Sequence, residues 1–333
     1  MACLSAGAVV AVPVCAGFAE EDETERHSMK EHFFFTHPGR GLAAWIVITL
    51  VWWQPHLDEP RWIMPLLFFA ALFLMPFSHA LQRGTSAATT RDTQVEVFCA
   101  FMLVLSFAQD EVLWAVVLTL PWLVWRVWWA VGSVQTLRHA QWTVGDLASA
   151  SAGVFPVIGA LWLTLHQTNW PLFGFDPLIV MLTAAHFHHA GFTLPLMAGL
   201  NAKARPGCWT RFSCVAILLG VPLVAIGITC MHFGMLPFVE PFGVTVLVLG
   251  ALGVAVSQIQ RGLEKESGRL VRLGFVVSGV SLLAAMLLAL GFGLRYVLPN
   301  LALTMPQMWA IHGTLNVFGF GLCGILAWRG ATR

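Results

Sequence analysis

The chain alternates long apolar stretches with short polar breaks, and this pattern predicts a bundle of membrane-spanning helices. The breaks gather charged and turn-forming residues, as in "QPHLDEPR", "QRGTSAATTRD", "NAKARPG" and "QRGLEKESGR". Most apolar stretches approach the roughly 20 residues that a helix needs to cross about 30 Å of hydrocarbon. Ten spans are predicted, at residues 41–55, 61–80, 94–108, 112–133, 144–166, 177–200, 212–231, 241–260, 272–293 and 305–328.

The amino-acid composition also indicates a membrane protein. Apolar residues make up 58% and charged residues 11% of the 333 positions, against roughly 25% charged residues in an ordinary soluble domain. We therefore expect residues 41–333 to form a single all-α, polytopic transmembrane domain in contact with the lipid bilayer. The seven cysteines lie apart without a CxxC pair, which indicates neither a disulfide framework nor a zinc knuckle. No Gly-rich phosphate loop or nucleotide motif is present in the sequence, so neither a nucleotide nor a nucleic acid is an expected partner.

The Lys and Arg residues predict the orientation. If the N-terminus is cytoplasmic, only Arg61 and Arg295 of the 18 basic residues face outward, while Arg126 lies within the fourth span. Basic residues concentrate in cytoplasmic loops of membrane proteins. This asymmetry predicts an even number of spans with both termini cytoplasmic.

Residues 1–40 differ from the rest of the chain. Their first part, "MACLSAGAVVAVPVCAGFAEEDE", has the apolar core of a signal peptide but lacks a basic segment before it. Two interpretations stay open: a signal-like sequence, or a translation start at Met29 with a short basic lead into the first span. Either way, we expect this N-terminal segment to be disordered and outside the transmembrane domain.

The sixth predicted span carries three histidines near its middle, His186, His188 and His189, within "MLTAAHFHHAGFTLPLMAGL". An unpaired polar group in hydrocarbon costs several kcal/mol, so each imidazole needs a hydrogen-bond partner, a ligand or water. At about 100° per residue, His186 and His189 share one face and His188 points roughly 200° away from His186. We interpret the three as ligands or proton carriers.

The last predicted span supplies a candidate partner, His312, with Asn316 on the same face one turn later. An amide beside a ligand histidine commonly orients its ring. Met305 and Met308, at the outer end of that span, are soft potential ligands. The predicted cofactor-binding residues are His186, His188, His312 and Asn316, and the predicted metal ligands are His186, His188, His189 and His312.

Other polar residues within or beside the spans receive structural interpretations. His56, His166 and His232 fall at outer helix ends, where histidines are ordinary, although the outer half would gather seven imidazoles if the helices converged. Glu96 and Arg126, on the third and fourth spans, are expected to form an ion pair near the cytoplasmic side.

Two motifs in combination resemble the YndJ-like family of bacterial membrane proteins. "LTAAHFHHAGFTLPLMAGL" contains the pattern HFHxAGF, and the late "MWAIHGTLNVFGFGLCGILAW" contains HGxxNxxGF. The matching positions are His186, Phe187, His188, Ala190, Gly191 and Phe192, then His312, Gly313, Asn316, Gly319 and Phe320. The resemblance implies a multi-pass protein of the bacterial inner membrane, from a family sometimes labelled as transporters. His189 stands where the family pattern leads us to expect an aromatic residue.

A second likeness is local. Ala-His-Phe-His at 185–188 is similar to the helix of haem–copper oxidase subunit I whose two histidines bind two haems on opposite faces. The chain lacks a His-Pro-Glu-Val-Tyr segment and a separate His-His pair, and its single tyrosine is Tyr296. We therefore do not expect an oxygen-reducing binuclear centre. We expect instead a haem or a single transition metal, held by His186 or His188 together with His312.

Three functional hypotheses follow from the sequence. In the first, the histidines bind a metal or haem for a redox, sensing or hydrolytic role, with a redox partner. In the second, they relay protons or bind a small molecule in a proton-coupled permease, and the proline-containing stretches "VFPVIGA" and "GFTLPLM" mark unwound helices. In the third, the protein is a non-catalytic assembly factor. No sequence signature decides whether the protein is an enzyme.

Overall fold

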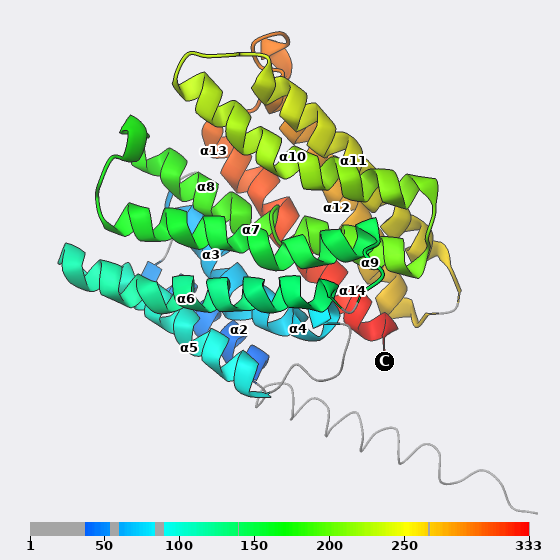
Figure 1. The fold of residues 1–333 in the computed structure, drawn as a ribbon, viewed down its shortest axis with the longest axis horizontal. Helices are drawn as coiled ribbons and strands as arrows, with labels where there is room; N and C mark the ends of the chain where they lie inside the picture. The colour runs from blue at the N-terminus through cyan, green and yellow to red at the C-terminus, as the bar shows by residue number, and fades with distance from the viewer. Residues whose placement is uncertain (1–36, 54–59, 84–89, 139, 266, 333) are drawn as a thin grey trace, which may run out of the picture.

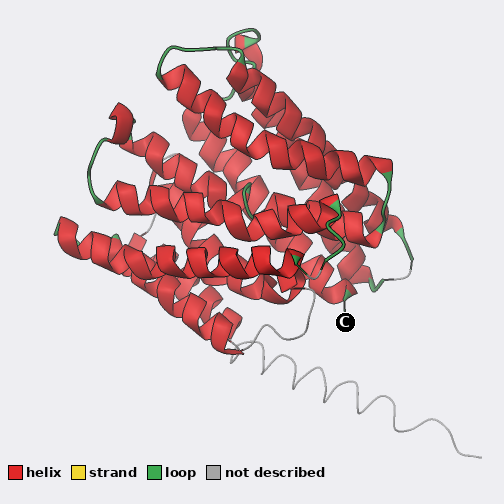
Figure 2. Cartoon of the chain, viewed as in Figure 1, coloured by secondary structure: helices red, strands yellow, loops and turns green. Residues whose placement is uncertain are grey.

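The computed structural model describes residues 37–53, 60–83, 90–138, 140–265 and 267–332, and every regular element among them is a helix (Figures 1 and 2). The N-terminal segment up to residue 36, with its signal-like stretch and Met29, lies outside the described residues, as does His56. The first described helix begins at His37, four residues before the predicted start of the transmembrane domain.

The elements follow one another with short connections. The first group is α2 (His37–Val47), η1 (Ile48–Trp53), η2 (Pro60–Trp62), α3 (Ile63–Phe69), η3 (Ala70–Leu74), α4 (Met75–Arg83), α5 (Thr90–Ser106), α6 (Val112–Leu137), α7 (Val144–Gln167) and η4 (Leu172–Gly174). The second group is α8 (Pro177–His189), α9 (Thr193–Ala204), α10 (Cys208–His232), α11 (Val239–Leu263), α12 (Arg269–Gly293), η5 (Pro299–Leu301), α13 (Met305–Gln307), η6 (Met308–Gly313), η7 (Leu315–Leu322) and α14 (Cys323–Ala331).

Apart from turns at residues 107–108 and 190–192, the described parts of the predicted spans are helical, which confirms an all-α polytopic bundle. In the described part of the chain, 7 helices are long and apolar enough to cross a membrane. The remaining predicted spans correspond to a shorter apolar helix at Gly39–Leu50, to the 17-residue α5 and to the pair α8 and α9. The protein is therefore a multi-pass integral membrane protein.

Local sequence signals explain where several helices begin. Thr143 starts α7 with a capping box, in which its hydroxyl accepts from the backbone N–H of Asp146 at 3.2 Å. Asp176 caps α8 by accepting from the backbone N–H of Leu178 at 2.7 Å. Thr304 repeats the capping box at the start of the last span.

The sixth span differs from its prediction as one continuous helix, because it breaks between His189 and Thr193. In a continuous helix Pro195 would lack the N–H that bonds to the carbonyl four residues earlier, and its ring would clash there. A new helix starting at Thr193 places Pro195 in the first turn, where backbone N–H groups have no intrahelical partner anyway. The predicted interruption is thus confirmed here, whereas Pro156 leaves α7 continuous.

The second span lies at the centre of the helix bundle. The helix Pro60–Gln82 has 94% of its apolar window buried inside the protein, far more than the other spans, so it is surrounded by protein rather than lipid. The packed series α5, α6, α7 and α8 lies on one side, and α10, α11 and α12 pack together on the other (Figure 1). The last span, from α13 to α14, packs against α12.

Candidate functional site

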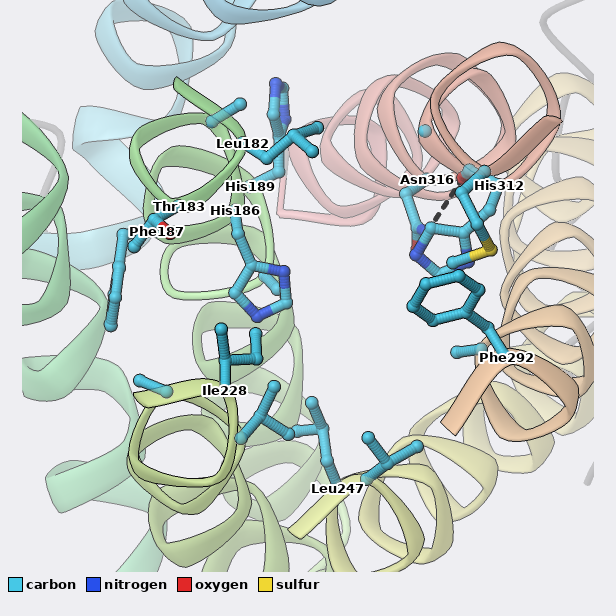
Figure 3. Close-up of a pocket in the computed structure, with 18 of the residues that line it drawn as sticks. Leu182, Thr183, His186, Phe187, His189, Ile228, Leu247, Phe292, His312 and Asn316 are labelled. Atoms are coloured by element: carbon cyan, nitrogen blue, oxygen red, sulfur yellow. Dashed lines mark hydrogen bonds between the residues drawn. The ribbon is translucent and has the colours of Figure 1, made fainter. Parts of the chain in front are cut away.

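A cavity of about 770 Å³ lies in the half of the bundle predicted to face outward, between α8 and the C-terminal helices. Most of its lining is apolar. The polar residues on which the argument below depends are His186, His189, Glu240, Arg295, His312 and Asn316. Figure 3 shows His186 on one side of the cavity, with His312 and Asn316 on the opposite side. The structure thus brings residues of the sixth and last spans to one site.

The break after α8 leaves the three central histidines on different sides of that helix. His186 and His189 both line the cavity, while His188 is 0% exposed and contacts α6. The predicted division into two faces is confirmed. Only two of the three histidines predicted on the sixth span therefore line the cavity.

His186 lines the cavity with a ring that has one nitrogen without a partner. Its ring points into the cavity (Figure 3), and its Nε2 atom is buried without a hydrogen-bond partner among the described residues. A buried imidazole nitrogen without a partner costs free energy, because it has lost its bond to water. A molecule that bonds to this nitrogen recovers that loss.

His312 is held in one orientation. Its Nδ1 atom donates to the carbonyl of Ala285 on α12 at 2.8 Å, so in the neutral ring Nε2 is the acceptor. The Asn316 amide donates to that Nε2 at 3.1 Å and to the His312 carbonyl at 2.9 Å. The predicted pairing of Asn316 with His312 is confirmed. Because both ring nitrogens are engaged, His312 binds a ligand at Nε2 only if Asn316 moves.

The helix that carries His312 is unusual. Met308–Gly313 and Leu315–Leu322 are π-helical, a conformation that is rare overall and frequent at functional sites. Nothing in the sequence analysis anticipated it. Met305 and Met308 line the same cavity, as soft side chains at its outer end.

His189 is attached to the central span. Its Nε2 atom donates to the carbonyl of Leu66 on α3 at 2.9 Å, and its Nδ1 is buried without a hydrogen-bond partner in the part of the chain that the structure describes. The histidine thus bridges α8 to the central helix at the edge of the cavity.

His188 fills a tight position between helices. Its Nε2 accepts from the Trp122 indole at 3.0 Å, and its Nδ1 donates to the Ala184 carbonyl at 2.8 Å. On α7, a β-carbon built at Gly159 would lie 2.6 Å from His188 Nδ1, so only glycine fits there. Both ring nitrogens are satisfied, which makes His188 a packing residue in this structure.

No group of three or more His, Cys, Asp and Glu side chains able to hold a metal ion occurs within the described ranges. His186, His189 and His312 share a cavity, but His189 and His312 bond to backbone carbonyls, and His188 faces elsewhere. Metal binding by His186, His188, His189 and His312 stays a prediction.

Two outer histidines that the structure describes, His166 and His232, do not line the cavity. His232 stacks on Phe175 at 4.1 Å and bonds through Nε2 to the Phe173 carbonyl at 2.9 Å. His166 stacks on Phe107 at the end of α7. These two contacts agree with the structural interpretation of histidines at helix ends.

A second polar cluster lies on the opposite side of α8, in the half predicted to face the cytoplasm. Glu96 on α5 pairs with Arg126 on α6, as predicted, and its other oxygen pairs with His79 on α4, which the sequence analysis missed. All three side chains are at most 2% exposed. Arg126 also lies 4.5 Å from the ring of Trp122, the residue that bonds to His188. The cluster therefore reaches α8 through one tryptophan.

An ion pair closes the outer end of the cavity. Arg295, in the loop after α12, donates to both carboxylate oxygens of Glu240 on α11, at 2.7 and 2.9 Å. Partial burial lowers the pKa of Arg295, but the hydrogen bonds and charge of Glu240 outweigh it and hold that pKa above its usual value. The sequence showed two opposite charges on the outer side but gave no signal that they would meet.

Comparison with known proteins identifies relatives. The model of a family described as "YndJ-like protein" matches residues 65–320. A protein of Bacillus subtilis (strain 168), named "Uncharacterized membrane protein YndJ", is 28% identical over 174 residues, which cover 51% of this chain and 30% of the relative. The matched part of this chain thus covers less than a third of that relative's length. No solved structure matches.

Proposed function

Because this chain belongs to the YndJ-like family of membrane proteins, we propose that it binds an apolar small molecule inside the bundle, as the substrate site of a permease. The observation that carries the proposal is the ring of His186, which points into a cavity of about 770 Å³ (Figure 3) and whose buried Nε2 atom has no hydrogen-bond partner among the described residues. Ligand pockets in proteins have volumes of roughly 300–1,000 Å³, apolar walls and a few placed polar groups.

The position of the break in the sixth span supports transport rather than static binding. Permeases often place the substrate site near the bilayer midplane, beside discontinuous helices. Here α8 ends at His189 and α9 starts at Thr193, and residues on both sides of the break line the cavity. A broken helix allows its two halves to move separately around a bound molecule.

The direct test is to identify what the protein carries. Wild-type protein is purified in lipid nanodiscs, and small molecules that remain bound are extracted and identified by mass spectrometry. We expect one compound at stoichiometric level in the wild type, lost in His186→Ala and retained in the matched variant His166→Ala. Equal retention in all three proteins, or no bound compound in any of them, would contradict the proposal.

A bound haem or transition metal is the second candidate, and the same nitrogen favours it. The imidazole of His186 would ligate the iron or metal, and the thioether of Met308, which lines the same cavity, would be a second possible ligand. Visible spectra and elemental analysis of the same preparations decide between the two candidates. A Soret band or stoichiometric metal that disappears in His186→Ala would replace the permease proposal with a cofactor site.

A further inference from the structure

We propose that the ligand of this cavity is an uncharged membrane lipid with a single long apolar chain and one hydrogen-bonding headgroup, which enters sideways from the bilayer between α7 and α10. This inference rests on the proposed binding function and names its substrate class. Four features of the cavity carry it.

The first feature is charge. Among the described residues that line the cavity, only Glu240 and Arg295 are charged, and they neutralise one another through two hydrogen bonds. A charged ligand would be buried in an apolar space without a counter-charge, which costs many kcal/mol. An uncharged molecule avoids that cost.

The second feature is the closed aqueous end. The Glu240–Arg295 pair joins α11 to the loop after α12 on the outer side, and Arg295 also lies 4.5 Å from the ring of Phe292. Glu240 is 5% exposed and the Arg295 side chain 23%, so the ion pair shields the carboxylate from water at this end. A ligand that entered from the water would have to separate the pair.

The third feature is an opening toward the lipid. Ile158 on α7 and Ile226 on α10 line the cavity and are also 38% and 51% exposed. The two helices contact each other, and α8 lies between their outer ends in Figure 1. Because both isoleucines line the cavity and keep a large accessible surface on spanning helices, we place the opening of the cavity toward the bilayer between α7 and α10.

The fourth feature is the distribution of polar groups inside. Among the described residues that line the cavity, His186 Nε2, His189 Nδ1 and Trp309 Nε1 have no hydrogen-bond partner, whereas His312 and Asn316 already bond to each other and to backbone carbonyls. One hydroxyl or carbonyl group suffices for His186, and the remaining surface around it suits a hydrocarbon chain. The geometry matches an amphiphile with a single small headgroup.

The experiment uses two photoreactive probes in proteoliposomes. One is a long-chain alcohol with a diazirine in its chain, and the other is the fatty acid of the same length and diazirine position, charged at neutral pH. After illumination, labelled peptides are mapped by mass spectrometry. We expect the alcohol to label cavity-lining positions such as Leu182 and Ile228, at a yield at least about fivefold above the fatty acid.

The opening is tested with paired substitutions on the same two helices. Ile158→Trp with Ile226→Trp places two indoles where the chain would lie, and labelling of the cavity should fall to less than about a fifth. The matched control is Leu161→Trp with Leu219→Trp, two residues that are 48% and 55% exposed and lie outside the cavity lining. The control should label like the wild type.

Each other outcome has a separate meaning. Unchanged cavity labelling in the Ile158→Trp, Ile226→Trp protein would overturn the lateral opening, and equal labelling by the fatty acid would overturn the uncharged class. Absence of cavity labelling by the alcohol, with a compound still lost from His186→Ala in the extraction experiment, would overturn this inference while the binding function stands. Absence of both would overturn the two proposals together.

Discussion

At the residue scale, the hydrogen-bond partners on neighbouring helices determine the role of each buried imidazole in this bundle. His188 receives an indole donor and a carbonyl acceptor and becomes a packing group. His312 is held by a carbonyl and an amide. The Nε2 atom of His186 has no hydrogen-bond partner among the described residues, and our proposal that His186 binds the ligand rests on this difference.

The buried ion pair leads to a stability prediction. Glu96→Gln leaves Arg126 as an uncompensated buried cation, and we expect a loss of about 3–5 kcal/mol in the free energy of unfolding. Replacing both residues, as Glu96→Gln with Arg126→Met, removes both charges and should recover most of that loss. The measurement is unfolding by SDS titration in mixed micelles. A double variant no more stable than Glu96→Gln would show that charge compensation is not the cause.

The bond between α6 and α8 leads to a second prediction. Trp122→Phe removes the indole donor to His188 Nε2 and leaves that buried acceptor unpaired, which should cost about 1–3 kcal/mol. The matched control is Trp114→Phe on the same helix, at a position that is 56% exposed. Both variants are compared by the same SDS titration, and equal stability of the two would contradict the role assigned to this bond.

At the element scale, the break between α8 and α9 depends on a close approach at Gly191. A β-carbon built there would lie 2.6 Å from the Phe187 carbonyl oxygen and 3.0 Å from Phe155 Cβ on α7. The turn therefore fits against α7 only with glycine at this position. Pro195 and Gly191 together hold the break next to the cavity that His186 faces.

Gly191→Ala should therefore destabilise the protein by about 1–3 kcal/mol through overpacking. It should also lower the stoichiometry of the bound compound, because a shift of the turn displaces His186. Gly132→Ala on α6 is the control, since a β-carbon there has no atom within 4 Å. It should be neutral or slightly stabilising, as alanine favours helix. Thermal unfolding in nanodiscs and mass spectrometry measure both effects.

At the scale of the whole molecule, the basic loops and the acidic outer rim give the bundle two different ends. The positive-inside asymmetry predicts that the loop around Gly207 is cytoplasmic and that the loop with Arg295 is outside. This orientation predicts that the cavity lies in the outer half of the membrane and the Glu96 cluster in the inner half.

This orientation is tested by cysteine accessibility in a variant whose native cysteines are replaced. In intact cells, a membrane-impermeant maleimide should label Asn300→Cys, an exposed position after α12, and should spare a cysteine restored at position 208. Permeabilised cells should show labelling at both sites. The opposite pattern would invert the bundle and place the cavity in the inner half.

The sequence by itself determined the class of the protein, the spans and the two faces of the sixth span. These follow from local physics: hydrocarbon requires apolar helices about 20 residues long, and helix geometry fixes which side chains share a face. Asn316 beside His312 was predictable for the same reason, because the two residues lie one turn apart.

Only the tertiary structure decided which polar residues meet. His79 joins Glu96, Arg295 joins Glu240, and His188 turns to Trp122 because distant segments pack there, and periodicity carries no information on such pairings. The same holds for the cavity, which residues of α8 line on one side and residues of the C-terminal helices on the other. A sequence indicates that a buried polar group needs a partner, whereas the packed fold determines which group provides it and which nitrogen stays free for a ligand.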